Sequence, residues 1–206
     1  MAFQTSKDFF LEIAKGNVPK HSVVIDFGRN NDIDTGADED IWMQGGTFAE
    51  PTAARTMRFA SSSANDAAAG TGARTVYIEG LDSSYNIATE TITLNGTSNV
   101  DSVGTYTFIN SAYVTTFGSG GTNAGDITIT ALVDLTVQGK IAAGIAEHKQ
   151  AIYMVPTGYS AYMTGVSMSI QQATANNSID IVLMSKTFGS GGYRVRDHFN
   201  LTNTGT

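Results

Sequence analysis

Between Arg55 and Ala131 the sequence alternates between apolar and polar residues, and short turn segments interrupt the pattern. Alternation with a period of two places one face of a β-strand toward a core. Segments of this kind are 56–59, 76–79, 89–94, 106–108, 112–114 and 127–131. The turns between them are rich in Gly, Asn and Ser, which adopt turn conformations easily. The pattern therefore predicts an all-β fold, an antiparallel β-sandwich or barrel with jelly-roll-like strands.

The residues before this region predict an N-terminal arm over 1–54. A short helix is expected from Ser6 to Lys15, with Ser6 as its N-cap and Gly16 as its C-terminal stop. A strand is expected at Val23–Phe27, followed by an acidic loop. Because the arm shows few signs of a core of its own, we expect it to reach over an adjacent subunit. The expected interface anchors are Phe9, Phe10, Ile13 and Trp42.

The residues after the alternating region predict a second strand cluster, so the expected domains are 1–54, 55–138 and 139–206. The expected strands of this cluster are Ala151–Val155, Tyr159–Ile170, Ile179–Lys186 and Tyr193–Leu201. The near-continuous apolar run from Ile181 to Met184 predicts that the third of them is buried. No clear last strand completes the cluster. We therefore expect either that a partner supplies the missing edge or that the chain is truncated or partly ordered.

Composition narrows the classes of function. Only 15% of the 206 residues are charged, and the formal net charge is −7. A nucleic-acid-binding protein would instead gather Lys and Arg to neutralise phosphates. The absence of cysteine excludes disulfides and cysteine-based zinc sites. No apolar run is long enough to cross a bilayer, and no signal peptide is recognisable, so we expect synthesis in a cytoplasm.

The acidic loop Arg29–Asp40 is the first candidate for metal binding. Clustered carboxylates at Asp32, Asp34 and Asp38 are the kind of ligand that Ca²⁺ prefers. The loop does not match an EF-hand, because Ala37 and Met43 stand where the motif requires Gly and Glu. A solvated turn stabilised by local hydrogen bonds is the favoured interpretation, and we predict no metal or other cofactor.

The sequence contains no recognisable catalytic constellation. His21, His148 and His198 are far apart, and there is no G-x-S-x-G nucleophile motif. The glycine-rich stretch 70–72 lacks the Lys and the helix of a phosphate-binding loop. We therefore predict a protein that is not an enzyme, with no catalytic residues. In the same region Arg74 is free to pair with a carboxylate such as Asp66 or Asp82.

Several ordered motifs resemble structural proteins of tailed bacteriophages. They are FGRNNDIDTGADEDIWMQGGTF at 27–48, SSSANDAAAGTGARTVYIEGLDSSYN at 61–86, ETITLNGT at 90–97, NAGDITIT at 123–130 and YMVPTGYSAYM at 153–163. The resemblance implies a component of the virion head or neck that is made in the host bacterial cytoplasm. It also implies an oligomer, for which we expect a homo-oligomer, with a trimer favoured, that contacts major capsid or neck proteins. From the net charge and the lack of a long apolar run we expect no nucleic-acid or membrane partner.

Two functional hypotheses follow. The first is a non-enzymatic capsid decoration or cement protein, with a neck-associated protein as its close variant. The second is a receptor- or glycan-binding tail protein, in which Tyr85, Tyr113 and Tyr193 would stack on sugars. An exposed row of aromatic side chains with carboxylates nearby would favour glycan binding, whereas buried tyrosines would favour packing.

Overall fold

The chain forms two compact units, residues 1–160 and residues 161–206. The computed structural model describes residues 9–34, 36–171, 177–187 and 191–203. The described N-terminal part contains a single short helix, α1 (Phe9–Ala14). The expected cap at Ser6 lies outside the described residues. In the described chain no helix has the length and apolar character to cross a membrane.

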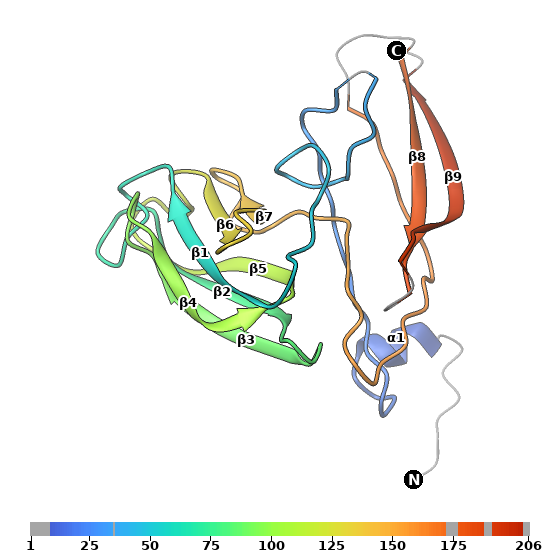
Figure 1. The fold of residues 1–206 in the computed structure, drawn as a ribbon, viewed down its shortest axis with the longest axis horizontal. Helices are drawn as coiled ribbons and strands as arrows, with labels where there is room; N and C mark the ends of the chain where they lie inside the picture. The colour runs from blue at the N-terminus through green and yellow to red at the C-terminus, as the bar shows by residue number, and fades with distance from the viewer. Residues whose placement is uncertain (1–8, 35, 172–176, 188–190, 204–206) are drawn as a thin grey trace. The chain divides into compact units, whose positions relative to one another are not determined.

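The first unit contains two antiparallel sheets (Figure 1). One has the strand order β4-β1-β6-β7, built from β4 (Val100–Tyr106), β1 (Arg55–Ser61), β6 (Ile127–Ala131) and β7 (Val137–Ile141). The other has the order β3-β2-β5, built from β3 (Ile87–Thr93), β2 (Ala73–Leu81) and β5 (Phe108–Phe117). The chain passes from the first sheet to the second at Thr107, between β4 and β5.

Both sheets contribute to one hydrophobic core, which confirms the expected antiparallel all-β fold. Alternate residues of β1 and β6 are buried, as the sequence pattern predicts. Met57 and Phe59 of β1 belong to the same core cluster as Val76 and Ile78 of β2, and all four side chains are fully buried. This shared core makes the unit a β-sandwich.

Two polar side chains close the sides of the sandwich. On one side Glu90 of β3 accepts hydrogen bonds from the Val103 and Gly104 amides of β4, at 2.9 and 3.0 Å. On the other side the buried Asn123 donates to the carbonyl of Ala142, just after β7, and accepts from the Ala146 amide. The Ala146 carbonyl in turn accepts from Val114 of β5. The sheets are therefore joined by hydrogen bonds at both sides as well as by the core.

The observed units differ from the expected domains at both boundaries. The expected boundary at 138/139 falls inside β7, which pairs with β6 and so belongs to the sandwich. Part of the expected arm also belongs to it, because the ring of Phe48 contacts Trp42 on one side and Phe108 of β5 on the other. The backbone of Met43 and Ala151 adds hydrogen bonds between 41–43 and 149–151.

Three of the expected strands form no ladder. In the described chain, residues 23–27, 151–155 and 159–170 pair with no other segment as a strand. Residues 22–29 make no backbone hydrogen bond to any other described segment. The local sequence of a segment reflects only its preference for extended backbone. Forming a β-strand also requires a partner strand at its edge.

The second unit contains a two-stranded sheet of β8 (Asn177–Ser185) and β9 (Arg194–Asn203). One face carries the half-buried pairs Ile179–Leu201 and Ile181–Phe199. The strand at 179–186 is therefore confirmed, but its expected burial is wrong, because Val182 is 42% and Met184 46% exposed. A two-stranded sheet has no second layer to cover both of its faces.

Candidate functional site

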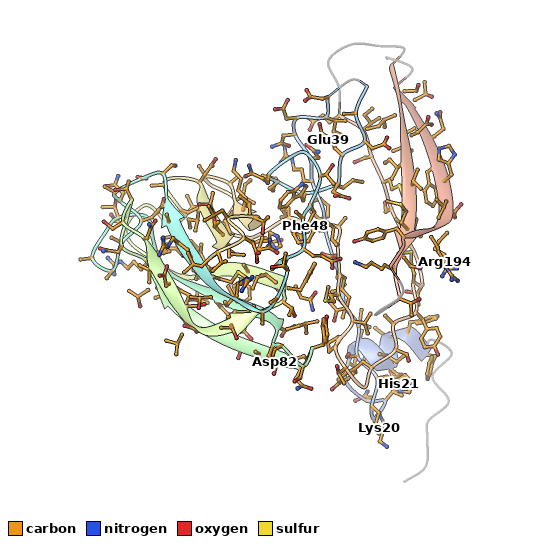
Figure 2. All side chains as sticks on the ribbon, in the orientation of Figure 1. Lys20, His21, Glu39, Phe48, Asp82 and Arg194 are labelled. Carbon is orange, nitrogen blue, oxygen red and sulfur yellow. The ribbon has the colours of Figure 1, made fainter. Side chains whose placement is uncertain are left out.

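Glu39, which is labelled in Figure 2, makes several hydrogen bonds within the acidic loop. The Glu39 carboxylate accepts hydrogen bonds from the Asp34 and Gly46 amides and from the side chain of Asn30. These bonds, the one from Asp34 foremost, lower the pKa of Glu39. Among the described residues, no group of three acidic or histidine side chains is placed so that it could hold a metal ion. Asp32, Asp34 and Asp38 therefore do not form such a group.

The three histidines lie in separate surroundings. His21 contacts the Pro19 carbonyl, His148 the side chain of Gln150, and His198 lies 3.8 Å from Asp180. Burial lowers the pKa of His148, which favours its neutral form. In the described chain none of these contacts reaches a serine hydroxyl, so the histidines form no nucleophile–base pair.

The four expected interface anchors separate into two classes. Phe9 and Phe10 are 55% and 59% exposed, so their rings are accessible to a partner. Ile13 and Trp42 are only 8% and 3% exposed. The indole of Trp42 donates to the Gly46 carbonyl and packs against Phe48 within its own unit. An intersubunit contact therefore stays a prediction for Phe9 and Phe10, whereas Trp42 stabilises its own chain.

The glycine-rich stretch 70–72 is part of the sandwich framework. The Gly72 carbonyl accepts from the Gly118 amide, and the Thr71 carbonyl accepts from the Gly120 amide. Arg74 donates to the Gly70 carbonyl, so the suggested ion pair with Asp66 or Asp82 is wrong. Asp66 is instead fully buried and accepts hydrogen bonds from backbone amides and from Ser61.

A row of side chains crosses the outer face of the β3-β2-β5 sheet. Tyr77 of β2 lies opposite Thr91 of β3 and Tyr113 of β5. The backbone of Tyr113 also forms an isolated antiparallel β-bridge with Glu147. The two tyrosine rings are 5.1 Å apart at an angle of 39°. Neighbouring core residues such as Val76 and Val114 point the other way because successive residues of a strand face opposite sides.

A cavity of about 320 Å³ lies beside this row. Its sheet side is formed by Glu79 of β2 and by 110–113 of β5, including Tyr113. Residues 24–27 of the N-terminal segment, Glu147, His148 and Tyr153 complete the lining. The site thus combines aromatic rings with the acidic side chains of Asp26, Glu79 and Glu147.

The electrostatics of the cavity follow from these carboxylates. Partial burial of its carboxyl in the cavity lining raises the pKa of Asp26 to about 6, although the residue as a whole is exposed. Burial, with smaller contributions from the charges of Glu79 and Asp26, raises the pKa of Tyr153. Glu147 forms an ion pair with Lys149, whose ammonium group also lies 4.8 Å from the centre of the Phe27 ring. The cavity therefore favours neutral or positively charged groups.

The raised pKa of Asp26 predicts a pH-dependent contact. In the unfolded chain the carboxyl titrates near 3.8, so from there to about pH 6 the folded state binds more protons. The contribution of Asp26 to stability is complete below the lower value and is lost as the pH rises through 6. We expect an NMR titration of the Asp26 carboxyl carbon to show a midpoint near 6. A midpoint near 4 would contradict a desolvated carboxyl.

The other two tyrosines proposed for sugar stacking do not join Tyr113. Tyr85 is half-buried in the turn between β2 and β3, and Tyr193 belongs to the second unit, where Lys186 lies over its ring. Sequence reasoning missed Tyr77, Glu79 and Ser111 as neighbours of Tyr113. Their alternation marks one face of each strand, but only the register between strands brings them together.

No family model, curated protein or solved structure matches this chain.

Proposed function

We propose that this protein is a structural component of a bacteriophage virion that decorates or cements the capsid through protein–protein contacts. The observation that carries the proposal is the exposed apolar surface of the N-terminal segment. Phe9, Phe10, Leu11, Val23, Val24, Ile25 and Phe27 are all at least 47% exposed, and Ile25 reaches 89%. Large apolar side chains that are exposed in such number over one segment are candidates for an interaction surface.

The second unit supports assembly by an independent argument. A two-stranded sheet is at best marginally stable by itself in water, and the chain has no cysteine to reinforce it. In the described residues β8 and β9 each keep one unpaired edge, which a neighbouring strand can extend. Contact with further copies of the chain would cover Val182, Met184 and Val195, and so we propose a homo-oligomer.

The motifs that resemble phage structural proteins direct the proposal toward a virion. Absence of a nucleophile–base pair around the described histidines supports a non-enzymatic role. A neck-associated position is the alternative, because the same apolar surfaces would serve a ring at one vertex. The two positions differ in where the protein lies on the particle rather than in the chemistry of its contacts.

The test uses particles of the virus that encodes the chain. Gold-labelled antibodies against the purified protein are expected to decorate the whole head shell in electron micrographs. Labelling at a single vertex would replace decoration by the neck alternative, and labelling at the distal tail would indicate recognition instead. If purified particles carry no label and no peptide of this chain by mass spectrometry, the virion proposal is wrong.

Disruption of the N-terminal surface should weaken assembly without unfolding the sandwich. We expect the double variant Phe9→Ser and Phe10→Ser to shift the purified protein from oligomer to monomer in analytical ultracentrifugation. Each substitution removes an exposed apolar ring. Loss of such an anchor from an interface commonly weakens the binding free energy by about 2 kcal/mol or more.

The matched control for this variant is Val103→Ser. Val103 is 94% exposed on β4 of the sandwich and is not part of the N-terminal segment, so this change should leave the oligomer intact. Equal sedimentation of the wild type, the double variant and the control would show that Phe9 and Phe10 do not belong to the interface.

A further inference from the structure

We propose that the cavity beside the Tyr77–Tyr113 row binds a saccharide, with Tyr113 as the stacking platform and Glu79 as the main hydrogen-bond acceptor. The ligand class is a neutral or amine-bearing sugar. The cavity shares residues 24–27 with the apolar segment assigned to assembly. Its proposed stacking and acceptor groups lie on β2 and β5, whereas the assembly variant changes Phe9 and Phe10, so either proposal can fail without the other.

The first argument is the presentation of an aromatic ring at the cavity. Tyr113 is 42% exposed, although it lies on a central part of β5. Tyr77 packs against it at 5.1 Å and fixes its position. A Tyr ring offers an apolar face and a polar hydroxyl, which matches a sugar, since sugars carry apolar C–H faces and hydroxyl edges.

The second argument is the supply of uncommitted polar groups around that ring. Within the described chain no hydrogen bond engages the Glu79 carboxylate or the hydroxyls of Ser111, Tyr113 and Tyr153, although all four residues line the cavity. By contrast, the amide of Asn110 is engaged at both ends by the backbone of Met154. A rigid wall with free donors and acceptors is the arrangement that orients a polar ligand.

The size and the charge of the cavity narrow the class of ligand further. A volume of about 320 Å³ is at the lower end of the range for small-ligand sites and fits roughly one or two sugar rings. Asp26, Glu79 and Glu147 would repel the carboxylates of uronic acids. Among the residues that the structure describes, Lys149 forms an ion pair with Glu147, and none does so with Asp26 or Glu79. Burial lowers the pKa of His148, so the imidazole adds no positive charge at neutral pH.

A cationic side chain from a partner protein is the competing occupant, since aromatic rings and carboxylates also attract Lys and Arg. The free hydroxyls of Ser111 and Tyr153 favour the saccharide. A Lys or Arg head group carries donors only, and a sugar hydroxyl both donates and accepts.

Affinity electrophoresis of the full chain tests the proposal, in native gels that contain dextran, laminarin, glycol chitin or alginate. We expect retardation by at least one of the first three polysaccharides and none by alginate, a polyuronate. Tyr113→Ala should weaken the binding at least about tenfold, and Glu79→Gln by a smaller factor. Tyr113→Phe should keep most of it, because the ring remains. Circular dichroism would confirm that each variant is folded.

The matched control is Tyr162→Ala, which removes a tyrosine that is 86% exposed outside the cavity lining. Retardation that falls equally in Tyr113→Ala and Tyr162→Ala, or no retardation in any gel, would overturn the proposal. So would binding of a lysine-rich peptide that is lost in Glu79→Gln while every polysaccharide fails to bind. That outcome would assign the cavity to a cationic protein partner.

Discussion

Replacement of Asp66 by Asn is expected to lower the free energy of unfolding of the sandwich by about 3–5 kcal/mol. Asp66 is fully buried. Its Oδ1 accepts from the Ala73 and Ala124 amides, and its Oδ2 accepts from the Gly125 amide and the Ser61 hydroxyl, at 2.6 to 2.9 Å. One carboxylate thus joins the ends of β1 and β2 to the loop before β6.

Asn has the same shape but lacks the second acceptor. Whichever way its amide is oriented, the NH₂ group faces at least one backbone N–H, so two donors meet where a donor met an acceptor. Rotation cannot relieve the conflict because both oxygens of Asp66 are occupied by backbone amides. The substitution therefore leaves buried donors unsatisfied in addition to removing hydrogen bonds to a charged group.

The control is Asp82→Asn in the turn between β2 and β3. The Ser84 and Asn86 amides both donate to Oδ1 of Asp82, and the carbonyl oxygen of Asn can take that place. Urea unfolding followed by the fluorescence of Trp42, the only tryptophan and a buried one, measures both variants. Equal midpoints for Asp66→Asn and Asp82→Asn would show that Asp66 does not stabilise the fold in this way.

The sandwich strands could be predicted because the alternation of apolar and polar residues is visible within each short segment of sequence. Met57 and Phe59 share one face of β1, and Ile127 and Ile129 share one face of β6. Residues 23–27 also have the apolar composition of a strand, yet that segment has no ladder partner in the described chain. Strand formation therefore depended on a distant partner that no local pattern reveals.

The candidate site was even less accessible to sequence reasoning. Tyr77 and Tyr113 are neighbours only through the register of β2 and β5, and Glu147 joins them through a single bridge. The sequence indicated Asp66 only as a possible partner of Arg74, because it lies in a small, polar loop. Its burial arises from the way this loop folds against 123–125, which is a tertiary contact.

Phe59→Ala is expected to destabilise the sandwich by about 3–5 kcal/mol, the usual cost of removing a buried Phe ring. Phe59 is fully buried on β1, where it lies opposite Val100 of β4 on one side and Ile129 of β6 on the other. Because neighbouring strands on both sides hold its backbone, the surrounding structure has little freedom to fill the space that the ring leaves.

Val103→Ala is the control for this loss of packing, since it truncates an apolar side chain that is 94% exposed on β4. We expect its urea midpoint to stay close to that of the wild type. A loss below about 1 kcal/mol for Phe59→Ala would mean that the site collapses around the smaller side chain. Collapse of that kind requires the two sheets to move together, so a small effect would contradict a rigid core shared by both sheets.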